Sequence, residues 1–168
     1  MKKLIARLLC LALAATMVAC GKKVENLEGT TEEIIASVQE AHGAVELPLM
    51  TLPMDLSDMD AVTLNTGLTS VDNVKEIAIS EPMMGQAYSL VMVRAASADD
   101  AAAIAQSMFD NIDTRKWICV EADTKVAAYY GDVAMFFMVS SDFAEQTTTD
   151  KMVEAFQTVC GEGVTVIK

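Results

Sequence analysis

Few side chains in this sequence have the types and spacing that catalysis requires. His42 is the only histidine among 168 residues, so any Cys–His or Ser–His–Asp site would have to recruit it. The sequence has no Gly-x-Ser-x-Gly segment of a hydrolase and no glycine-rich phosphate loop. His42 precedes Gly43 near the end of an expected helix, where a partly protonated imidazole stabilises the helix C-terminus. The sequence therefore predicts a structural role for His42.

Methionines and aspartates gather between residues 50 and 60. Met50, Met54 and Met59 could offer thioether ligands to Cu(I), although methionine more often fills gaps in cores or forms adaptable surfaces. The acidic segment 55–60 lacks the alternating spacing and the glycine of a calcium loop. Carboxylates are so frequent in the chain that no pair can be assigned to glycoside hydrolysis. We therefore predict no metal site and no cofactor, and keep two alternatives: a methionine-based metal-handling protein and a carboxylate enzyme of the cell envelope.

The N-terminal residues have the pattern of a secretory signal. Lys2, Lys3 and Arg7 are followed by the uncharged run 8–19, which consists mostly of Leu, Ala, Val and Met. A positive segment followed by a short apolar run is typical of signal peptides. A membrane-spanning helix needs about 20 apolar residues, so this run is too short to remain as a span.

A cysteine follows this apolar run at a characteristic place. The segment Met17-Val18-Ala19-Cys20, followed by Gly21, resembles the lipobox of bacterial lipoproteins, in which an aliphatic and a small residue precede an obligatory cysteine. The resemblance implies cleavage after Ala19 and attachment of a diacylglyceryl group to the Cys20 thiol. Two acyl chains are enough for stable membrane anchoring. An ordinary cleavable signal beside a cysteine, or a retained N-terminal helix, is the alternative.

The charge of the remaining chain limits its partners. Residues 1–19 contain three of the 12 basic residues and none of the 24 acids, so residues 20–168 have a net charge of −15. Such a surface repels nucleic acid and anionic headgroups. We therefore expect no nucleic-acid partner, and membrane association through the lipid anchor alone. The expected location is the cell membrane, with the protein facing outside the cytoplasm.

The sequence predicts a lipidated tether, residues 20–30, followed by one acidic domain, residues 31–168. Thr30 and Glu33 have the spacing of a capping box at the start of a helix that ends before Gly43. Residues 44–70 have no clear pattern apart from a candidate short helix over 58–64, because prolines interrupt them.

Two similar units follow, residues 73–113 and 124–160, each with two strand patterns and a helix pattern. Ser97 is the expected N-cap of the first helix, and Gly131-Asp132 suits a two-residue type II′ turn in the second hairpin. The expected strands are residues 74–80, 88–95, 125–130 and 133–139.

The expected fold class is α+β. In each unit the second strand is the more continuously apolar, which favours a four-stranded, largely antiparallel sheet with the two second strands at its centre. The two ββα units would place their helices on one face, and the N-terminal helix would precede them.

Residues 72–112 and the hairpin segment YYGDVAMFF, residues 129–137, also carry a family resemblance. They are similar to a group of small lipoproteins from Gram-positive anaerobes, whose shared domain has no known function. The resemblance covers residues 32–140. It implies an extracytoplasmic setting and no catalytic residue.

Three aromatic residues are candidates for a binding surface. Tyr129 and Tyr130 are adjacent on one strand, so they point to opposite faces of the sheet. If helices cover one face only, one of these tyrosines is exposed on the open face. Trp117 is the third candidate, and Tyr88 is a further aromatic residue able to face a ligand.

Cys119 and Cys160 are the cysteines outside the expected signal and anchor, in a compartment that permits oxidation. If the two units are related by duplication, their helices end at one edge of the sheet, which places both thiols near that edge. Cys119 and Cys160 are therefore a candidate disulfide. The alternative is that Cys160, on the apolar stripe of its helix, is a buried free thiol.

The function expected from the sequence is a non-enzymatic binding or interaction module, held on the membrane by lipid. Its protein or small-molecule ligand is not specified by any motif.

Overall fold

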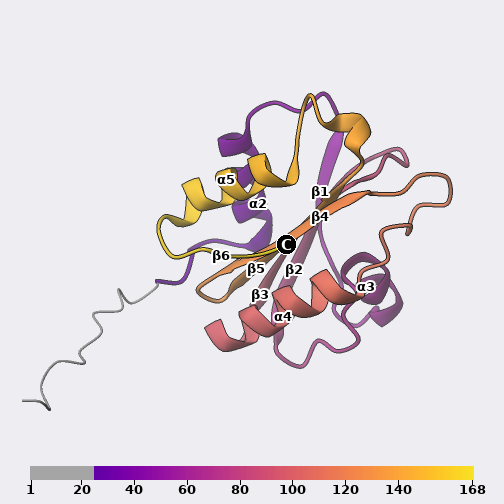
Figure 1. Ribbon diagram of the computed structural model, residues 1–168. Coiled ribbons are helices and arrows are strands. Elements are labelled where there is room, and N and C mark those ends of the chain that lie inside the picture. The colour runs from indigo at the N-terminus through magenta and orange to yellow at the C-terminus, as the bar shows by residue number, and fades with distance from the viewer. Residues whose placement is uncertain (1–24) are drawn as a thin grey trace, which may run out of the picture.

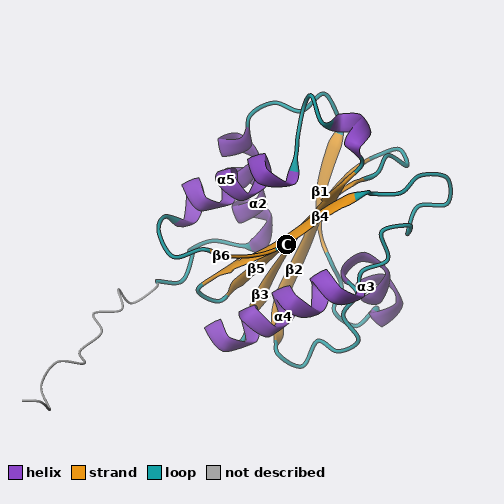
Figure 2. Ribbon diagram, viewed as in Figure 1, coloured by secondary structure: helices purple, strands orange, loops and turns teal. Residues whose placement is uncertain are grey.

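A six-stranded antiparallel sheet with helices on both faces forms the centre of the protein (Figures 1 and 2). The computed structural model describes residues 25–168. The elements are α2 (Thr31–His42), β1 (Leu49–Pro53), α3 (Met59–Thr66), β2 (Val74–Pro82), β3 (Tyr88–Ala95), α4 (Ala98–Asn111), β4 (Thr124–Tyr130), β5 (Val133–Val139), the 3-10 turn η1 (Ser141–Phe143), α5 (Thr149–Cys160) and β6 (Thr165–Ile167). The strand order is β1-β2-β3-β5-β4-β6, and each neighbouring pair is antiparallel.

The α+β class and the antiparallel sheet are confirmed, but the prediction of four strands is wrong. The four expected strands are β2, β3, β4 and β5, with β3 and β5 at the centre as their apolar sequences indicated. The missed strands are the two edges. β1 ends at Pro53, and an edge strand tolerates proline because one side of it makes no ladder hydrogen bonds. β6 has only three residues, too few for a periodic pattern.

The prediction that helices cover one face is also wrong, because the sheet separates two apolar layers. Leu90 and Met92 of β3 pack with α2 and α5 on one face. Val91 and Val93 of the same strand pack with α3 and α4 on the other. Figure 2 shows these two helix pairs on opposite sides of the sheet. Neither face is open to solvent over the central strands.

The connections explain why α4 and α5 lie on opposite faces. The crossover β3-α4-β4 joins two parallel strands and skips β5, and the crossover β5-α5-β6 joins two parallel strands and skips β4. Both move across the sheet towards β6, but β3 and β5 run in opposite directions. Two crossovers of the same hand must then use opposite faces, and one hand is strongly preferred. The two ββα units therefore follow the same order along the chain but are not related by a rotation.

Local signals in the sequence do form the expected caps and turn. The Thr30 hydroxyl accepts from the Glu33 backbone N–H at 3.3 Å, and the Glu33 carboxylate accepts from the Thr30 N–H at 2.9 Å. Ser97 caps α4. Gly131 has a φ of 54°, as the first central residue of a type II′ turn requires.

Candidate functional site

The two ends of the sheet differ in the loops and side chains that lie there. Tyr88 and Arg94 lie near opposite ends of β3, about 20 Å apart at 3.4 Å per residue. The β4–β5 turn, residues 131–132, lies at the Arg94 end, which we call the hairpin end. The β2–β3 loop, residues 83–87, and the long loop 113–123 lie at the Tyr88 end, which we call the loop end. In Figure 1 these two loops lie at the opposite end of the sheet from residues 25–30, which are drawn in indigo.

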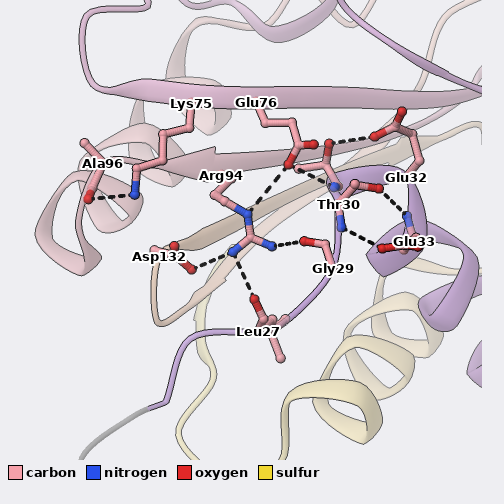
Figure 3. A network of polar contacts seen from close by, with 11 residues as sticks. Leu27, Gly29, Thr30, Glu32, Glu33, Lys75, Glu76, Arg94, Ala96 and Asp132 are labelled. Atoms are coloured by element: carbon pink, nitrogen blue, oxygen red, sulfur yellow. Dashed lines mark hydrogen bonds and ion pairs between the residues drawn. The ribbon is translucent and has the colours of Figure 1, made fainter.

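At the hairpin end, Arg94 holds the N-terminal segment (Figure 3). Its Nη1 donates to the Leu27 carbonyl oxygen and to Asp132 Oδ1, both at 3.0 Å. Its Nη2 donates to the Gly29 carbonyl oxygen at 2.6 Å, and its Nε lies 3.6 Å from Glu76 Oε2. The planar fork of an arginine can make several directed bonds of this kind at once.

Because of the Arg94 network, part of the expected tether is bound to the domain. The sequence predicts a free linker over residues 20–30, but its described part, residues 25–30, contacts the folded domain. Leu27 packs against the core formed with α2 and α5. Glu76 Oε2 also accepts from the Thr31 N–H at 3.1 Å, which satisfies a donor in the first turn of α2.

At the loop end, large apolar side chains are exposed on two loops. Met83 and Met84, in the β2–β3 loop, are 70% and 74% exposed. Ile118, in the 113–123 loop, is fully exposed, and Val120 of the same loop is also exposed. Single exposed apolar residues are common on protein surfaces, whereas several gathered at one end of a domain indicate a contact surface.

A buried ion pair joins the bases of these two loops. Lys116 Nζ contacts Glu81 Oε1, and the Lys116 side chain is only 3% exposed. Glu81 lies two residues before Met83, and Lys116 lies two residues before Ile118. The pair therefore fixes where both loops leave the sheet.

Further contacts hold the Lys116 ammonium group in place. Its Nζ donates to Asn65 Oδ1 at 2.9 Å and to Ser89 Oγ at 3.2 Å, and it lies 5.1 Å from the centre of the Trp117 ring. Burial lowers the pKa of Lys116, and the charge of Glu81 opposes this shift. A serine beside a lysine with a lowered pKa could form a nucleophile and base. Ser89 is completely buried, however, so a substrate has no approach to its hydroxyl.

Acidic groups surround a cavity of about 410 Å³ next to this surface. Glu121, Asp123 and Asp142 are among the residues that line it. Asp123 accepts hydrogen bonds from the Ser141 N–H at 2.7 Å and from the Ser141 hydroxyl at 2.5 Å. These bonds lower the pKa of Asp123, which makes it a poor proton donor. The cavity therefore gives no support to an acid–base enzyme built on this carboxylate.

The structure does not bring the three predicted aromatic residues together. Trp117 lies at the loop end, half-buried under Lys116. Tyr129 and Tyr130 lie at the hairpin end, where each packs at the margin of a different core layer. The expectation that one of the tyrosines faces an open side of the sheet is wrong, because helices cover both faces.

Cys119 and Cys160 are both free thiols. Cys119 is exposed in the 113–123 loop, whereas Cys160 is buried at the end of α5. Burial raises the pKa of Cys160 to about 12. The expected disulfide requires α4 and α5 to lie on one face of the sheet, whereas they lie on opposite faces. The predicted lipidation site, Cys20, and the signal segment lie outside the described residues.

The histidine and the methionines considered as possible ligands or catalytic groups have contacts typical of a structural role. His42 lies in the last turn of α2 as expected, and its Nε2 is 2.9 Å from Thr147 Oγ1. Met54 and Met59 pack at the margin of the core with α3 and α4, and Met50 is exposed on β1. Within residues 25–168, no group of three or more His, Cys, Asp or Glu side chains is arranged to hold a metal ion.

The sequence interpretation missed the apolar residues of the loop end, although a signal was present. Met83-Met84 stands between Pro82 and Gly85, and residues 117–120 form an apolar run outside any helix or strand. Consecutive apolar residues in turns are unusual unless they are functional. The ion pair had no signal, because its partners are far apart in the sequence.

No family model, curated protein or solved structure matches the chain. Among residues 25–168, no helix has the length and apolar character needed to cross a membrane.

Proposed function

We propose that this protein is a lipid-anchored, extracytoplasmic interaction module that binds a protein partner through the loop end of its sheet. The observation that carries the proposal is the buried Lys116–Glu81 pair, which fixes two loops that expose large apolar side chains. Prearranged apolar side chains lose little conformational entropy on binding, so more of their burial energy contributes to affinity. Methionine and tryptophan are also enriched in the centres of protein interfaces.

The charge of the domain favours a partner with a basic rim. Residues 25–168 contain seven basic and 24 acidic residues. Both cations of the 113–123 loop are in ion pairs, Lys116 with Glu81 and Arg115 with Glu121 at 3.0 Å. Asp123 and Asp142 leave the surroundings of the apolar surface negative. A complementary protein surface has an apolar centre surrounded by lysine or arginine.

The proposed anchor would leave this surface free, because it attaches at the other end of the sheet. Six residues lie between Cys20 and Leu27, which the Arg94 network holds at the hairpin end, so the two positions are seven residue steps apart. Such a segment spans at most about 25 Å when fully extended. The hairpin end would then stay within that distance of the lipid headgroups, and the loop end could reach about 20 Å further out.

Replacement of the proposed lipidated cysteine tests the anchor. Cys20→Ser removes the thiol that would take the diacylglyceryl group, so the protein should leave the membrane fraction or accumulate as uncleaved precursor. Mass measurement of the purified protein separates these results. A mature, membrane-bound protein without lipid would contradict the proposal.

Site-specific photocrosslinking tests the interaction surface. A photoreactive benzoylphenylalanine is placed at Ile118 or, as a matched exposed apolar control, at Leu52 on the edge strand β1. In cells of the native host, position 118 should give an adduct of one defined mass that position 52 does not give. Met84→Asp should suppress this adduct by placing a charge in the contact. Equal adducts at both positions, or no effect of Met84→Asp, would exclude the loop end as the binding surface.

A further inference from the structure

The methionines of residues 25–168 fall into three groups by exposure. Met83 and Met84 of the β2–β3 loop are 70% and 74% exposed, and Met50 on the edge strand β1 is 42% exposed. Met54 and Met59 are half-buried at the margin of a core layer. The remaining ones are completely buried: Met92, Met108, Met135, Met138 and Met152. A reagent in solvent therefore meets the sulfur atoms of Met83 and Met84 most easily.

The fold does not depend on the side chains of Met83 and Met84. Neither side chain belongs to a core layer. Their loop is held through its backbone, because the Met83 N–H donates to the Pro48 carbonyl oxygen at 3.2 Å and the Met84 carbonyl oxygen accepts from the Gln86 N–H at 2.7 Å. A chemical change at the two sulfur atoms therefore alters the surface of the loop end and leaves the fold intact.

The methionine thioether is an apolar group that a mild oxidant converts into a polar one. An N-chloramine transfers its chlorine as Cl⁺ to the sulfur atom, water then adds its oxygen to the sulfur, and the chlorine leaves as chloride. The sulfur loses two electrons and the chlorine gains them. One proton of the water replaces the chlorine on the amine, and the other is released. Methionine sulfoxide reductases reverse the change at the sulfur.

We propose that Met83 and Met84 form a reversible oxidation site, at which an N-chloramine converts the loop end from a binding to a non-binding surface. The inference rests on the proposed function, because it concerns the same surface. A sulfoxide oxygen needs a hydrogen-bond donor, and an apolar contact with a partner supplies none. Asp123 and Asp142 at this end carry carboxylates, which only accept hydrogen bonds when ionised.

Oxidation of the purified full chain by chloramine-T locates the site. All proteins carry Cys119→Ser, because this exposed thiol would react with the same oxidant. After quenching with free methionine, fragment-ion mass spectrometry should show one added oxygen on Met83 and one on Met84, while the five buried methionines remain unmodified. The thermal unfolding midpoint should not change. Modification of the buried methionines at the same rate as Met83 and Met84 would overturn the proposal.

The photocrosslink at position 118 measures the effect on binding. The protein with benzoylphenylalanine at this position is oxidised, quenched and then mixed with the detergent-solubilised envelope of the native host, so that the partner itself is not oxidised. The adduct should fall about ten-fold, because the burial of a polar group without a hydrogen bond costs about this factor in affinity. Treatment of the oxidised protein with methionine sulfoxide reductases should restore the adduct.

Two variants assign the effect to the pair. Met83→Leu with Met84→Leu removes both sulfur atoms, so oxidation should leave the adduct yield of this variant unchanged from its own value before treatment. Met50→Leu is the matched control, because it removes an exposed methionine away from the loop end. Its adduct should remain as sensitive to oxidation as that of the parent protein.

The outcomes separate this inference from the proposed function. Lack of any adduct before oxidation would refute the proposed function, and the oxidation switch with it. An adduct that persists after both sulfoxides have formed would overturn only the switch. A loss that the reductases do not reverse would also overturn it, and this result needs no substitution at Met83 or Met84. A loss on oxidation of the double leucine variant would place the effect at another residue.

Discussion

The guanidinium group of Arg94 donates a 2.6 Å hydrogen bond to the carbonyl oxygen of Gly29, so a central strand holds the segment that leads to the N-terminus. Arg94→Ala should release residues 25–30 from the domain. It also leaves Asp132, whose side chain is 7% exposed, without its cation. The expected result is rapid amide exchange and new protease cleavage before Thr31, measured by mass spectrometry.

Arg94→Lys is the matched control for this change. The lysine keeps the charge beside Asp132 but cannot donate to both carbonyl groups in the same geometry. Residues 25–30 should therefore be released in Arg94→Lys too, with a smaller loss of overall stability than in Arg94→Ala. Protection of these residues in both variants would show that Arg94 does not hold them.

A second prediction concerns the pair at the base of the loops. Lys116→Met leaves the Glu81 carboxylate without its cation and should lower the free energy of unfolding by about 3 kcal/mol, as the loss of one partner of a buried pair does. Lys116→Met with Glu81→Gln removes both charges and should recover most of this loss. Urea denaturation measures both values. Equal losses in the single and double variants would contradict a coupled pair.

Trp117 provides a local measurement of the same pair. It is the only tryptophan of the chain and lies directly beside Lys116. Its fluorescence emission should shift to longer wavelength in Lys116→Met, because a released loop exposes the indole ring to water. An unchanged emission would mean that other contacts fix the loop.

The two thiols should differ in reactivity. Iodoacetamide at pH 8 should modify Cys119 in the native protein, because it is exposed. It should reach Cys160 only after denaturation, because that thiol is buried and its pKa is raised to about 12. Without a reductant, mass measurement should then show that only Cys119 is modified before denaturation and that both Cys119 and Cys160 are modified after it. Failure to modify either thiol in the denatured, unreduced protein would instead indicate a disulfide.

Alkaline pH should destabilise the fold through Tyr88 and Cys160. Their pKa values rise on folding from 10.0 and 9.0 to about 12, so the folded state keeps protons that the unfolded state releases. Their contribution to stability is complete below about pH 9 and is lost as the pH rises towards 12. Cys160→Ala should reduce the slope of unfolding free energy against pH between 9 and 12. An unchanged slope would exclude the buried thiol as its cause.

The central hairpins could be predicted from the sequence because they depend on local patterns. β5 is apolar throughout, and the glycine of the 131–132 turn defines its start. The faces used by α4 and α5 were not predicted, because they depend on the direction of each strand and the hand of each crossover. A duplication alone would place both helices on one face, whereas antiparallel β3 and β5 with crossovers of one hand require opposite faces.

The candidate surface was less predictable than the fold. The apolar run 117–120 and the pair Met83-Met84 could have been noticed in the sequence. The position of these two segments at one end of the sheet could not be predicted, because it depends on the contact between Lys116 and Glu81. These two residues are 35 positions apart in the sequence.

The attachment of residues 27–29 to Arg94 also determines how the domain would respond to mechanical force. If Cys20 is the anchor and a partner holds the loop end, tension runs along the strands from one end of the sheet to the other. The Arg94 hydrogen bonds would pass part of it to β3, which has a hydrogen-bonded strand on each side. The two ladders then share the load in shear, whereas a pull on β1 or β6 would peel an edge strand away bond by bond. Under such a load, the Arg94 network would favour shear between central strands over unzipping from an edge of the sheet.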